Sequence, residues 1–320
     1  MRHTFISWDC SFRNFHHLID ALACQDYDLS QVELLYIEQR SRAHADAYNH
    51  SAGLPSLHDR SVNESHPFLR VIHMDDPLDQ PYHLGRILNT GIKEARGEII
   101  TIMDGDMLLP KDFLIELDKI HQGKPAVVNV ERKMCPHPVG STMENWHKGH
   151  FEYEACLGIC PDPSHIPNYV TNKGPMISAP REAFIQAGGY DEHPMFATGL
   201  TRAGQDMNAR LELATKARSV VVKRVAVHPF HPQGFSRKTI DAVRVLQVHA
   251  SIINWTRKNS VINCGDRAAH LDSVYDKHRS LFRRVHEKDY SNTPFASLLK
   301  SPTLGQLYKW GLQLVRPFRP

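Results

Sequence analysis

Two carboxylates, separated by one glycine, follow an apolar segment near the first third of the chain. Residues 99–103, Ile-Ile-Thr-Ile-Met, predict a buried strand, and Asp104 and Asp106 come directly after it. Ligand sites of open α/β sheets lie at the carboxyl ends of the strands. Carboxylate oxygens bind hard divalent cations, which can bridge a protein to phosphate oxygens. Alone, the pair is more typical of a solvated acidic turn, so its meaning depends on the rest of the chain.

Three further residues have the right type and place to complete such a site. Asp206 lies at the start of an expected helix, where a carboxylate can act as a base or simply complement the helix dipole. His228 and His231 follow an expected strand, and imidazole suits Mn²⁺ better than Mg²⁺. A lone histidine is more often a packed or surface residue, so these two gain meaning only from the rest of the pattern.

The elements that must position these residues alternate between strand and helix. This order predicts an α/β fold with a Rossmann-like, mostly parallel sheet flanked by helices. The expected strands are 4–8, 32–37, 68–73, 99–103, 126–130, 176–178 and 220–227. The expected helices are 15–24, 84–95 with Gly97 as its C-terminal cap, 111–120, 181–187 and 206–217.

The remaining segments have a different character. Residues 134–172 are rich in Pro, His, Cys and aromatic residues and predict an irregular, partly helical insertion. Helical patterns cover 239–257, 267–287 and 303–314. We therefore divide the chain into an α/β domain, residues 1–235, and a helical C-terminal extension, residues 236–320.

The composition excludes several classes of protein. Hydrophobic residues make up 41% and charged residues 23% of the 320, which is typical of a folded chain. The net charge is +3 without a dense basic run, so nucleic acid is not an expected partner. No apolar run reaches the ~18 residues that span a bilayer, and no signal peptide is visible. We expect a cytoplasmic protein with reduced cysteines.

Residues 89–106 resemble the central signature of family-2 glycosyltransferases. Members of that family show Asn-x-Gly, then Ala-x-Gly, then an apolar strand, then Asp-x-Asp. The matching residues here are Asn89, Gly91, Ala95, Gly97, Asp104 and Asp106. The spacing fits throughout, which makes this the most specific signal in the chain.

Two downstream blocks agree with the resemblance. Residues 188–192, Gly-Gly-Tyr-Asp-Glu, look like an element of that family and of galactosyl- and N-acetylgalactosaminyl-type transferases, and Arg181 and Phe184 match its run-up. Residues 204–206, Gly-Gln-Asp, resemble the family's Gly-Glu-Asp, with Gln205 in place of the usual glutamate. An amide can hydrogen-bond an acceptor sugar, but it cannot act as a base.

The resemblance covers about residues 4–235 and implies a GT-A fold, a nucleotide-diphosphate sugar donor, UDP-sugar first, and Mn²⁺ or Mg²⁺. It implies an inverting displacement in which Asp206 takes the proton of the acceptor hydroxyl. Asp106 is the expected direct metal ligand with His228 or His231, whereas Asp104 reaches the ribose or a metal-bound water.

The resemblance also implies where the nucleotide and the acceptor bind. Glu38, Arg86, Asn89 and Asp104 are the expected nucleotide contacts; Arg86 could pair with phosphate oxygens. Asp75 and Asp76 more simply form a turn. The expected acceptor contacts are Trp146, Gly189, Tyr190 and Gln205.

The acceptor is expected to be a glycan or a lipid-linked sugar in surface polysaccharide synthesis. The amphipathic segment 304–316, with Trp310 beside Lys309, predicts either a docked tail helix or peripheral contact with the inner membrane face.

Two other functions fit parts of the pattern. A nucleotidyltransferase acting on sugar phosphates should carry a Gly-rich loop after the first strand, but residues 7–11 contain no glycine. A non-catalytic nucleotide-sugar binding module is consistent with Gln205, whereas the intact Asp104, Asp106 and Asp206 favour an enzyme. The cysteines and histidines of 135–160 lack compact zinc-ligand spacing.

Overall fold

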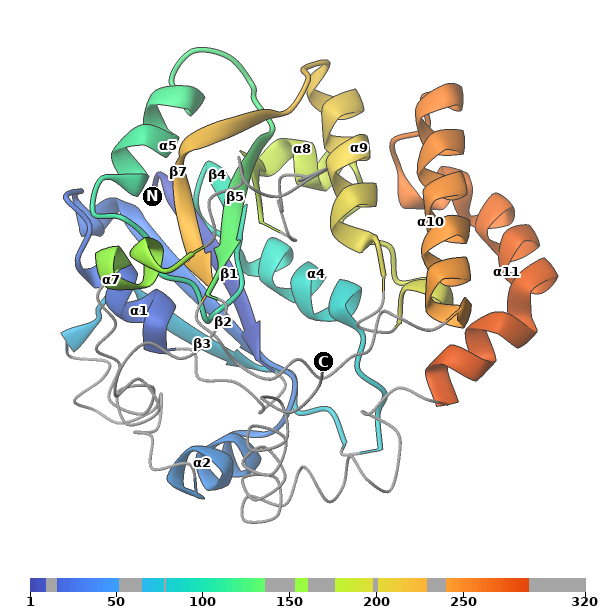
Figure 1. Ribbon diagram of the computed structural model, residues 1–320, viewed down its shortest axis with the longest axis horizontal. Helices are drawn as coiled ribbons and strands as arrows, with labels where there is room; N and C mark the ends of the chain where they lie inside the picture. The colour runs from blue at the N-terminus through green and yellow to red at the C-terminus, as the bar shows by residue number, and fades with distance from the viewer. Residues whose placement is uncertain are drawn as a thin grey trace.

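The computed structural model describes residues 1–9, 16–51, 65–77, 79–135, 153–160, 176–197, 201–228 and 240–287. Its strands are β1 (His3–Asp9), β2 (Val32–Glu38), β3 (Leu69–His73), β4 (Ile99–Ile102), β5 (Val128–Met134), β6 (Ile177–Pro180) and β7 (Val220–His228). They form one seven-stranded sheet in the order β3-β2-β1-β4-β6-β5-β7 (Figure 1). The expected α/β fold is confirmed.

The direction of the strands places three chain segments at one edge of the sheet. β1 is parallel to β2 and β4, and β5 is parallel to β7. β6 is antiparallel to both β4 and β5, so β4, β5 and β7 all run in the same direction. The segments that follow Ile102, Met134 and His228 therefore leave the sheet at the same edge, where open α/β sheets bind ligands.

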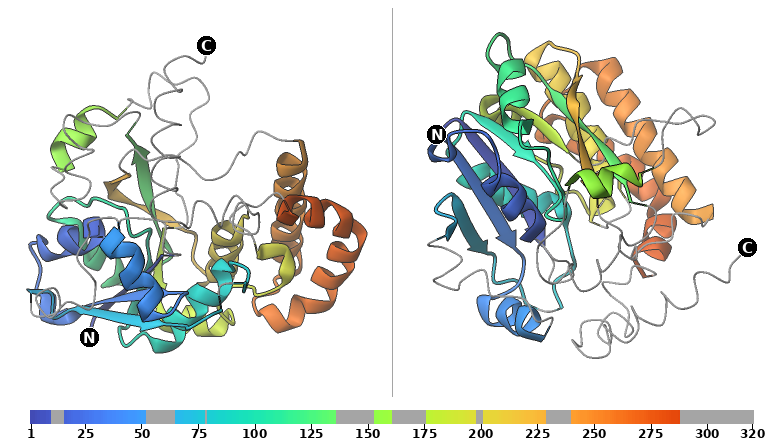
Figure 2. Two further views of the ribbon diagram at one scale, coloured as in Figure 1. Left: turned by 90° about the horizontal axis from the view of Figure 1, so that it is seen from below. Right: turned by 60° about the vertical axis from the view of Figure 1, so that its left-hand side comes forward.

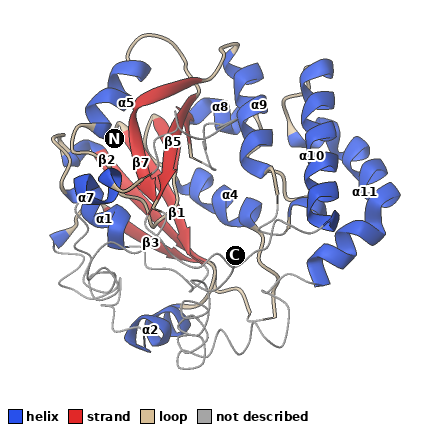
Figure 3. Cartoon of the chain, viewed as in Figure 1, coloured by secondary structure: helices blue, strands red, loops and turns tan. Residues whose placement is uncertain are grey.

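Helices cover both faces of the sheet, as Figure 3 shows with the strands in red at the centre. The helices are α1 (His16–Ala23), α2 (Arg42–Ser51), α4 (Leu84–Glu94), α5 (Phe113–His121), α7 (Tyr153–Gly158), α8 (Arg181–Gln186), α9 (Ala203–Thr215), α10 (Ile240–Asn259) and α11 (Cys264–Glu287). Two short 3₁₀ helices are η1 (Leu29–Gln31) and η3 (Pro194–Phe196).

Each face of the sheet has its own hydrophobic cluster. Residues of α1 and α5 pack with Phe5, Leu34 and Val128 on one face. Residues of α4, α8, α9, α10 and α11 pack with Ile6 and Leu35 on the other. Every residue of β2 is buried, because both of its faces are covered. Each fully buried Leu, Ile or Phe contributes about 1.5–3 kcal/mol to folding.

Gly91, the glycine of the Asn-x-Gly block, is required by the packing of α4 on the sheet. Helix α4 buries Ile87, Leu88 and Ile92 against the sheet, as expected for an amphipathic helix. A Cβ on Gly91 would lie 2.5 Å from Cγ2 of Ile6, so a side chain here would hold the helix away from β1. Glycine thus sets the distance at which α4 packs.

The expected capping role of Gly97 is wrong. Helix α4 ends at Glu94, and its C-cap residue is Ala95, which has an extended backbone. Gly97 instead packs against β1: its N–H donates to Thr4 Oγ1 over 2.8 Å, and an added Cβ would lie 2.6 Å from the Thr4 nitrogen. A close approach between two chain segments, rather than a helix end, requires the glycine.

The C-terminal helices α10 and α11 lie side by side, beside α9 (Figure 2). Val245 and Ile252 of α10, with Leu271 and Phe282 of α11, belong to the same cluster as Ile87 of α4. A division at residue 235 stays a prediction, but the described residues on its two sides share one hydrophobic core. None of the helices in the described ranges is both long and apolar enough to cross a membrane. The segment 304–316 lies outside those ranges.

Candidate metal and nucleotide site

Backbone hydrogen bonds hold the Asp-x-Asp turn at the sheet edge. The Leu18 N–H of α1 donates to the carbonyl of Gly105 over 3.2 Å. Two residues beyond the second aspartate, Leu108 exchanges backbone hydrogen bonds of 2.9 and 3.0 Å with Val227. Val227 directly precedes His228, so this short antiparallel bridge brings the turn against the end of β7.

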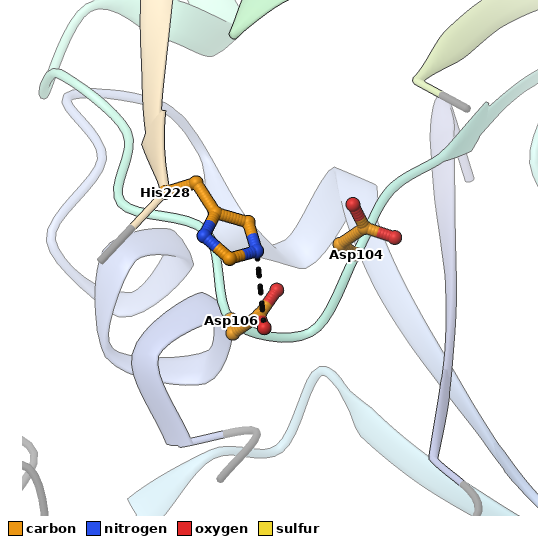
Figure 4. Close-up of side chains that lie close together, drawn as sticks. All are labelled: Asp104, Asp106 and His228. Atoms are coloured by element: carbon orange, nitrogen blue, oxygen red, sulfur yellow. Dashed lines mark ion pairs between the residues drawn. The ribbon is translucent and has the colours of Figure 1, made fainter. Parts of the chain in front are cut away.

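Asp104, Asp106 and His228 consequently meet (Figure 4). One ligand atom from each lies within 4.8 Å of the others, and all three side chains are buried. Nε2 of His228 is 3.3 Å from Oδ2 of Asp106. Two carboxylates and one imidazole form a donor set that suits a cation such as Mn²⁺ and leaves coordination positions for phosphate oxygens. His231, the other candidate, lies outside the described residues.

This is the one such cluster within the described ranges. Cys135 and Cys160 bring their sulfur atoms to 3.9 Å, and Cys156 lies nearby, but these thiols do not form a group of three close enough to hold a cation. The described cysteines are free. Cys135, Cys156 and Cys160 pack in an apolar cluster with Leu108 and Val227.

Arg132 of β5 is a site residue that the sequence did not indicate. Its Nη1 donates to Oδ2 of Asp104 over 2.7 Å, a charge-assisted hydrogen bond between two largely buried side chains. The strand reads Glu131-Arg132-Lys133, and nothing in a run of three charges distinguishes the middle one. Only the sheet order, with β6 between β4 and β5, places this arginine beside Asp104.

Asn89 joins the first sequence block to the second. Its Nδ2 donates to the carbonyl of Tyr190 over 2.8 Å and to Oε1 of Glu192 over 2.7 Å, while its Oδ1 accepts from the Tyr190 N–H over 2.6 Å. Gly188 and Gly189 have φ of 71° and 72°, and a Cβ on Gly189 would lie 2.3 Å from Asn89 Oδ1. The double glycine therefore lets its loop close onto Asn89. The nucleotide contact expected of Asn89 and the acceptor contact expected of Gly189 stay predictions.

Tyr190 is a core residue at the junction of the two blocks. Its side chain is 1% exposed, and burial raises the pKa of its hydroxyl. The charges of Asp206 and Asp104 raise this pKa further, and the charge of Arg210 opposes them. Its acceptor role stays a prediction.

Asp206 lies in the first turn of α9, where it is 1% exposed and bound by two arginines. Arg210 Nε donates to one carboxylate oxygen over 3.0 Å, and Arg267 Nη1 donates to both over 2.8 and 3.0 Å. Both arginines are fully buried. Asp206 thus has a structural function as the counter-charge of two guanidinium groups, and its base function stays a prediction.

The two arginines extend this network in different directions. Arg210 Nη1 donates to the carbonyls of Ala187 and Gly189, each over 2.7 Å, which fixes the double-glycine loop. Arg267 Nε lies 3.8 Å from Asp191 of the same loop. The i, i+4 spacing of Asp206 and Arg210 was a readable signal of a helix pair. Arg267 comes from α11, 61 residues away, and no local pattern indicates it.

The expected nucleotide residues occupy the ends of β2 and α4. Glu38 is buried and accepts from the Arg40 N–H over 3.0 Å. Arg86 forms an ion pair of 2.9 Å with Asp76, and Asp75 has a φ of 54°, consistent with a turn. The phosphate role of Arg86 and the nucleotide role of Glu38 stay predictions.

Arg40 donates to the carbonyls of Pro77 and Gln80. Gln205 lies on the exposed side of α9, and its Oε1 accepts from Arg202 over 2.7 Å. Trp146 lies outside the described residues.

Part of the chain is similar to a known protein family. Residues 64–159 match glycosyl transferase family 2, and this segment contains Asn89, Asp104 and Asp106. The match covers less than half of the chain. No curated protein matches the chain in sequence.

Solved structures agree on the fold. The chain is similar to residues 1–349 of TarS from S. aureus, with 16% identity and a TM-score of 0.52 over 90% of this chain and 72% of that one. The same protein in complex with UDP-GlcNAc gives 13% identity and a TM-score of 0.52 over 94% of this chain and 78% of that one. At this identity the likeness concerns the fold, which is GT-A-like as expected.

Proposed function

We propose that this protein transfers a sugar from a nucleotide-diphosphate sugar to an acceptor hydroxyl. The observation that carries the proposal is the buried group Asp104, Asp106 and His228 at the carboxyl edge of the sheet. Two of its three members lie in the segment that matches glycosyl transferase family 2. A nucleotidyltransferase or a non-catalytic binding module has no comparable support.

The donor proposed first is a UDP-sugar, since the similar TarS structures include complexes with UDP and with UDP-GlcNAc. Mn²⁺ or Mg²⁺, when bound, would neutralise the charge that develops on the departing diphosphate. Asp106 and His228 would hold the cation, and Asp104 would contact it or the ribose. Glu38 at the end of β2, Arg86 in the first turn of α4 and Asn89 in the middle of α4 would bind the nucleotide.

The proposed reaction is a single displacement with inversion at the anomeric carbon. Asp206 would take the proton of the acceptor hydroxyl, and Trp146, Gly189, Tyr190 and Gln205 would contact the acceptor. Because both oxygens of Asp206 accept from arginines, this step requires that one oxygen also reach the acceptor when donor and acceptor are bound.

The proposed acceptor is a glycan or lipid-linked sugar of a surface polysaccharide. The proposed location is the cytoplasm, with peripheral contact at the inner membrane face.

A donor screen tests the activity. Purified protein is incubated with UDP-, GDP- and TDP-sugars, with and without Mn²⁺, and release of nucleoside diphosphate is measured. We expect release from one donor class, dependent on the cation and lost in Asp106→Ala. A wild-type protein that releases nothing from any donor, or an Asp106→Ala variant that matches it, contradicts the proposal.

Asp206→Asn separates the base function from the structural one. The amide keeps the size of the side chain and one oxygen that can accept from an arginine, but its NH2 group is a donor and it cannot take a proton. We expect this variant to bind the donor and to lose transfer by about 100-fold or more. Loss of donor binding together with transfer would show that Asp206 is structural only.

A further inference from the structure

The ion pair between Arg132 and Asp104 involves a residue of the proposed cation site. Asp104 is 4% exposed and accepts from Arg132 over 2.7 Å. The same carboxylate belongs to the group that could hold a cation with Asp106 and His228. A guanidinium and a divalent cation on one carboxylate repel each other strongly in a buried site. The two partners therefore compete for Asp104.

The register between β5 and β7 places Arg132 on the face of the sheet that carries His228. Arg132 pairs with Ala226, and Met134 pairs with His228. Because alternate residues of a strand share a face, Arg132 lies on the same face as His228. Lys133, the next residue, lies on the opposite face, where its charge acts on Cys160.

Arg132 has donors that the described residues do not use. A guanidinium carries five N–H groups, and one hydrogen bond, that to Asp104, is made here. Its Nε is buried and has no hydrogen-bond partner in the part of the chain that the structure describes. A buried donor without a partner costs free energy unless a ligand satisfies it. The planar fork of an arginine matches the phosphate oxygens of a nucleotide, which it can bind through two N–H groups at once.

We propose that Arg132 exchanges partners: it binds Asp104 in the free protein and the diphosphate of the nucleotide in the loaded protein. The inference rests on the proposed function, because it requires a cation and a diphosphate at this site. Arg132 leaves Asp104 when that carboxylate turns to the cation, and its donors, Nε included, then pair with phosphate oxygens. No covalent bond changes in this exchange.

The exchange makes binding of the cation and of the diphosphate cooperative. Without nucleotide, release of Arg132 from Asp104 leaves a buried guanidinium without an anion, which weakens cation binding. With nucleotide, the released arginine gains phosphate partners, so each ligand favours the other by the same factor.

Manganese binding to the full-length protein tests the inference. The free Mn²⁺ signal in electron paramagnetic resonance gives the Mn²⁺ affinity with and without saturating UDP. In wild type, we expect UDP to tighten Mn²⁺ binding. In Arg132→Met, we expect Mn²⁺ alone to bind about tenfold more tightly, and the gain from UDP to shrink about tenfold. The matched control is Lys133→Met, which removes one charge from the other face and should change neither quantity.

The exchange requires both effects in Arg132→Met, the tighter binding of Mn²⁺ alone and the smaller gain from UDP. It is overturned if Arg132→Met leaves the affinity for Mn²⁺ alone unchanged or lower, or if the gain from UDP stays as large as in wild type. If that variant does not fold, Arg132→Gln gives the same measurement with a smaller loss of packing. A wild-type protein that binds neither Mn²⁺ nor UDP contradicts the proposed function itself and the exchange with it. If the wild-type protein binds Mn²⁺ and UDP but the Arg132 variants have the same affinities as wild type, the exchange is contradicted and the proposed function is not.

Discussion

Asp104 and Asp106 have different partners although one residue separates them. Gly105 carries the turn, and its carbonyl is fixed by Leu18, so the two carboxylates point to different neighbours. Asp106 faces His228 at 3.3 Å, and Asp104 faces Arg132 at 2.7 Å. This agrees with the interpretation that Asp106 is the direct cation ligand and that Asp104 has a second function.

His228 provides a test at the residue scale. Replacing it by alanine removes one of the three donors, and we expect Mn²⁺ affinity to fall by at least about tenfold. Isothermal titration calorimetry with Mn²⁺ measures the change. His270→Gln on α11, where the histidine stacks on Trp255, is the control and should bind Mn²⁺ as wild type does. Unchanged affinity in His228→Ala would assign the third ligand to another residue, with His231 as the next variant.

The double-glycine loop provides a second test at this scale. Gly189→Ala places a Cβ at a φ of 72° and 2.3 Å from Asn89 Oδ1. The left-handed backbone alone costs about 1–2 kcal/mol, and the clash adds to it. We expect the urea midpoint to fall by an amount that corresponds to more than about 2 kcal/mol. Gly123→Ala, where an added Cβ meets nothing within 4 Å, is the control. Equal midpoints for the two variants would contradict the packing account.

At the scale of elements, local pattern predicted most strands and helices, since apolar periodicity reports which face is covered. The strand 220–227 and the helix 84–95 match β7 and α4 to within a residue. Helix α2 was not expected, because its sequence, Arg-Ala-His-Ala-Asp-Ala-Tyr-Asn-His-Ser, has no apolar stripe. The sequence also predicted that Asp104 and Asp106 follow a buried strand, and they do; their function stays a prediction.

The partners of the site residues could not be predicted in the same way. Arg132 contacts Asp104 because β6 lies between β4 and β5 in the sheet. Arg267 contacts Asp206 because the C-terminal helices pack beside α9. Such contacts depend on which elements are neighbours in space, and no spacing in the sequence encodes that. The expectation for Gly97 failed for the same reason, because its true neighbour is Thr4 on another strand.

Arg267 links the helical segment to the α/β unit, which leads to a prediction about elements. Arg267→Met leaves Asp206 with one arginine in a fully buried place, and breaking one partner of a buried pair costs about 3–5 kcal/mol. We expect a corresponding loss in the free energy of unfolding, measured by urea titration of the full chain. Arg279→Met, on the exposed side of the same helix, should leave the midpoint unchanged. A midpoint for Arg267→Met equal to wild type would show that α11 does not support Asp206.

At the scale of the whole molecule, stability should depend on pH through two histidines near the amino end of the sheet. Burial lowers the pKa of His3 and of His121 from 6.5 to about 4 in each case. Asp118, at 3.3 Å from His3, opposes this shift but does not outweigh burial. Both histidines are therefore neutral in the folded protein at pH values where the unfolded chain already binds protons.

The sign of the effect follows from proton linkage. As pH falls from 7 to 5, the unfolded state takes up protons that the folded state does not, so folding loses free energy. Each histidine should cost about 2 kcal/mol over this interval. Urea unfolding at pH 7 and pH 5 measures the loss, and His3→Gln and His121→Gln should each reduce it. A loss that is the same in both variants and in wild type would contradict the assignment.

The central claim is that Asp104, Asp106 and His228 hold a divalent cation at a nucleotide-sugar site. Anomalous X-ray scattering from crystals soaked with Mn²⁺ and UDP tests this claim directly. The account predicts one manganese peak in contact with Asp106 and His228, with the diphosphate of UDP on its open side. A manganese peak elsewhere, or UDP bound away from these three residues, would contradict it.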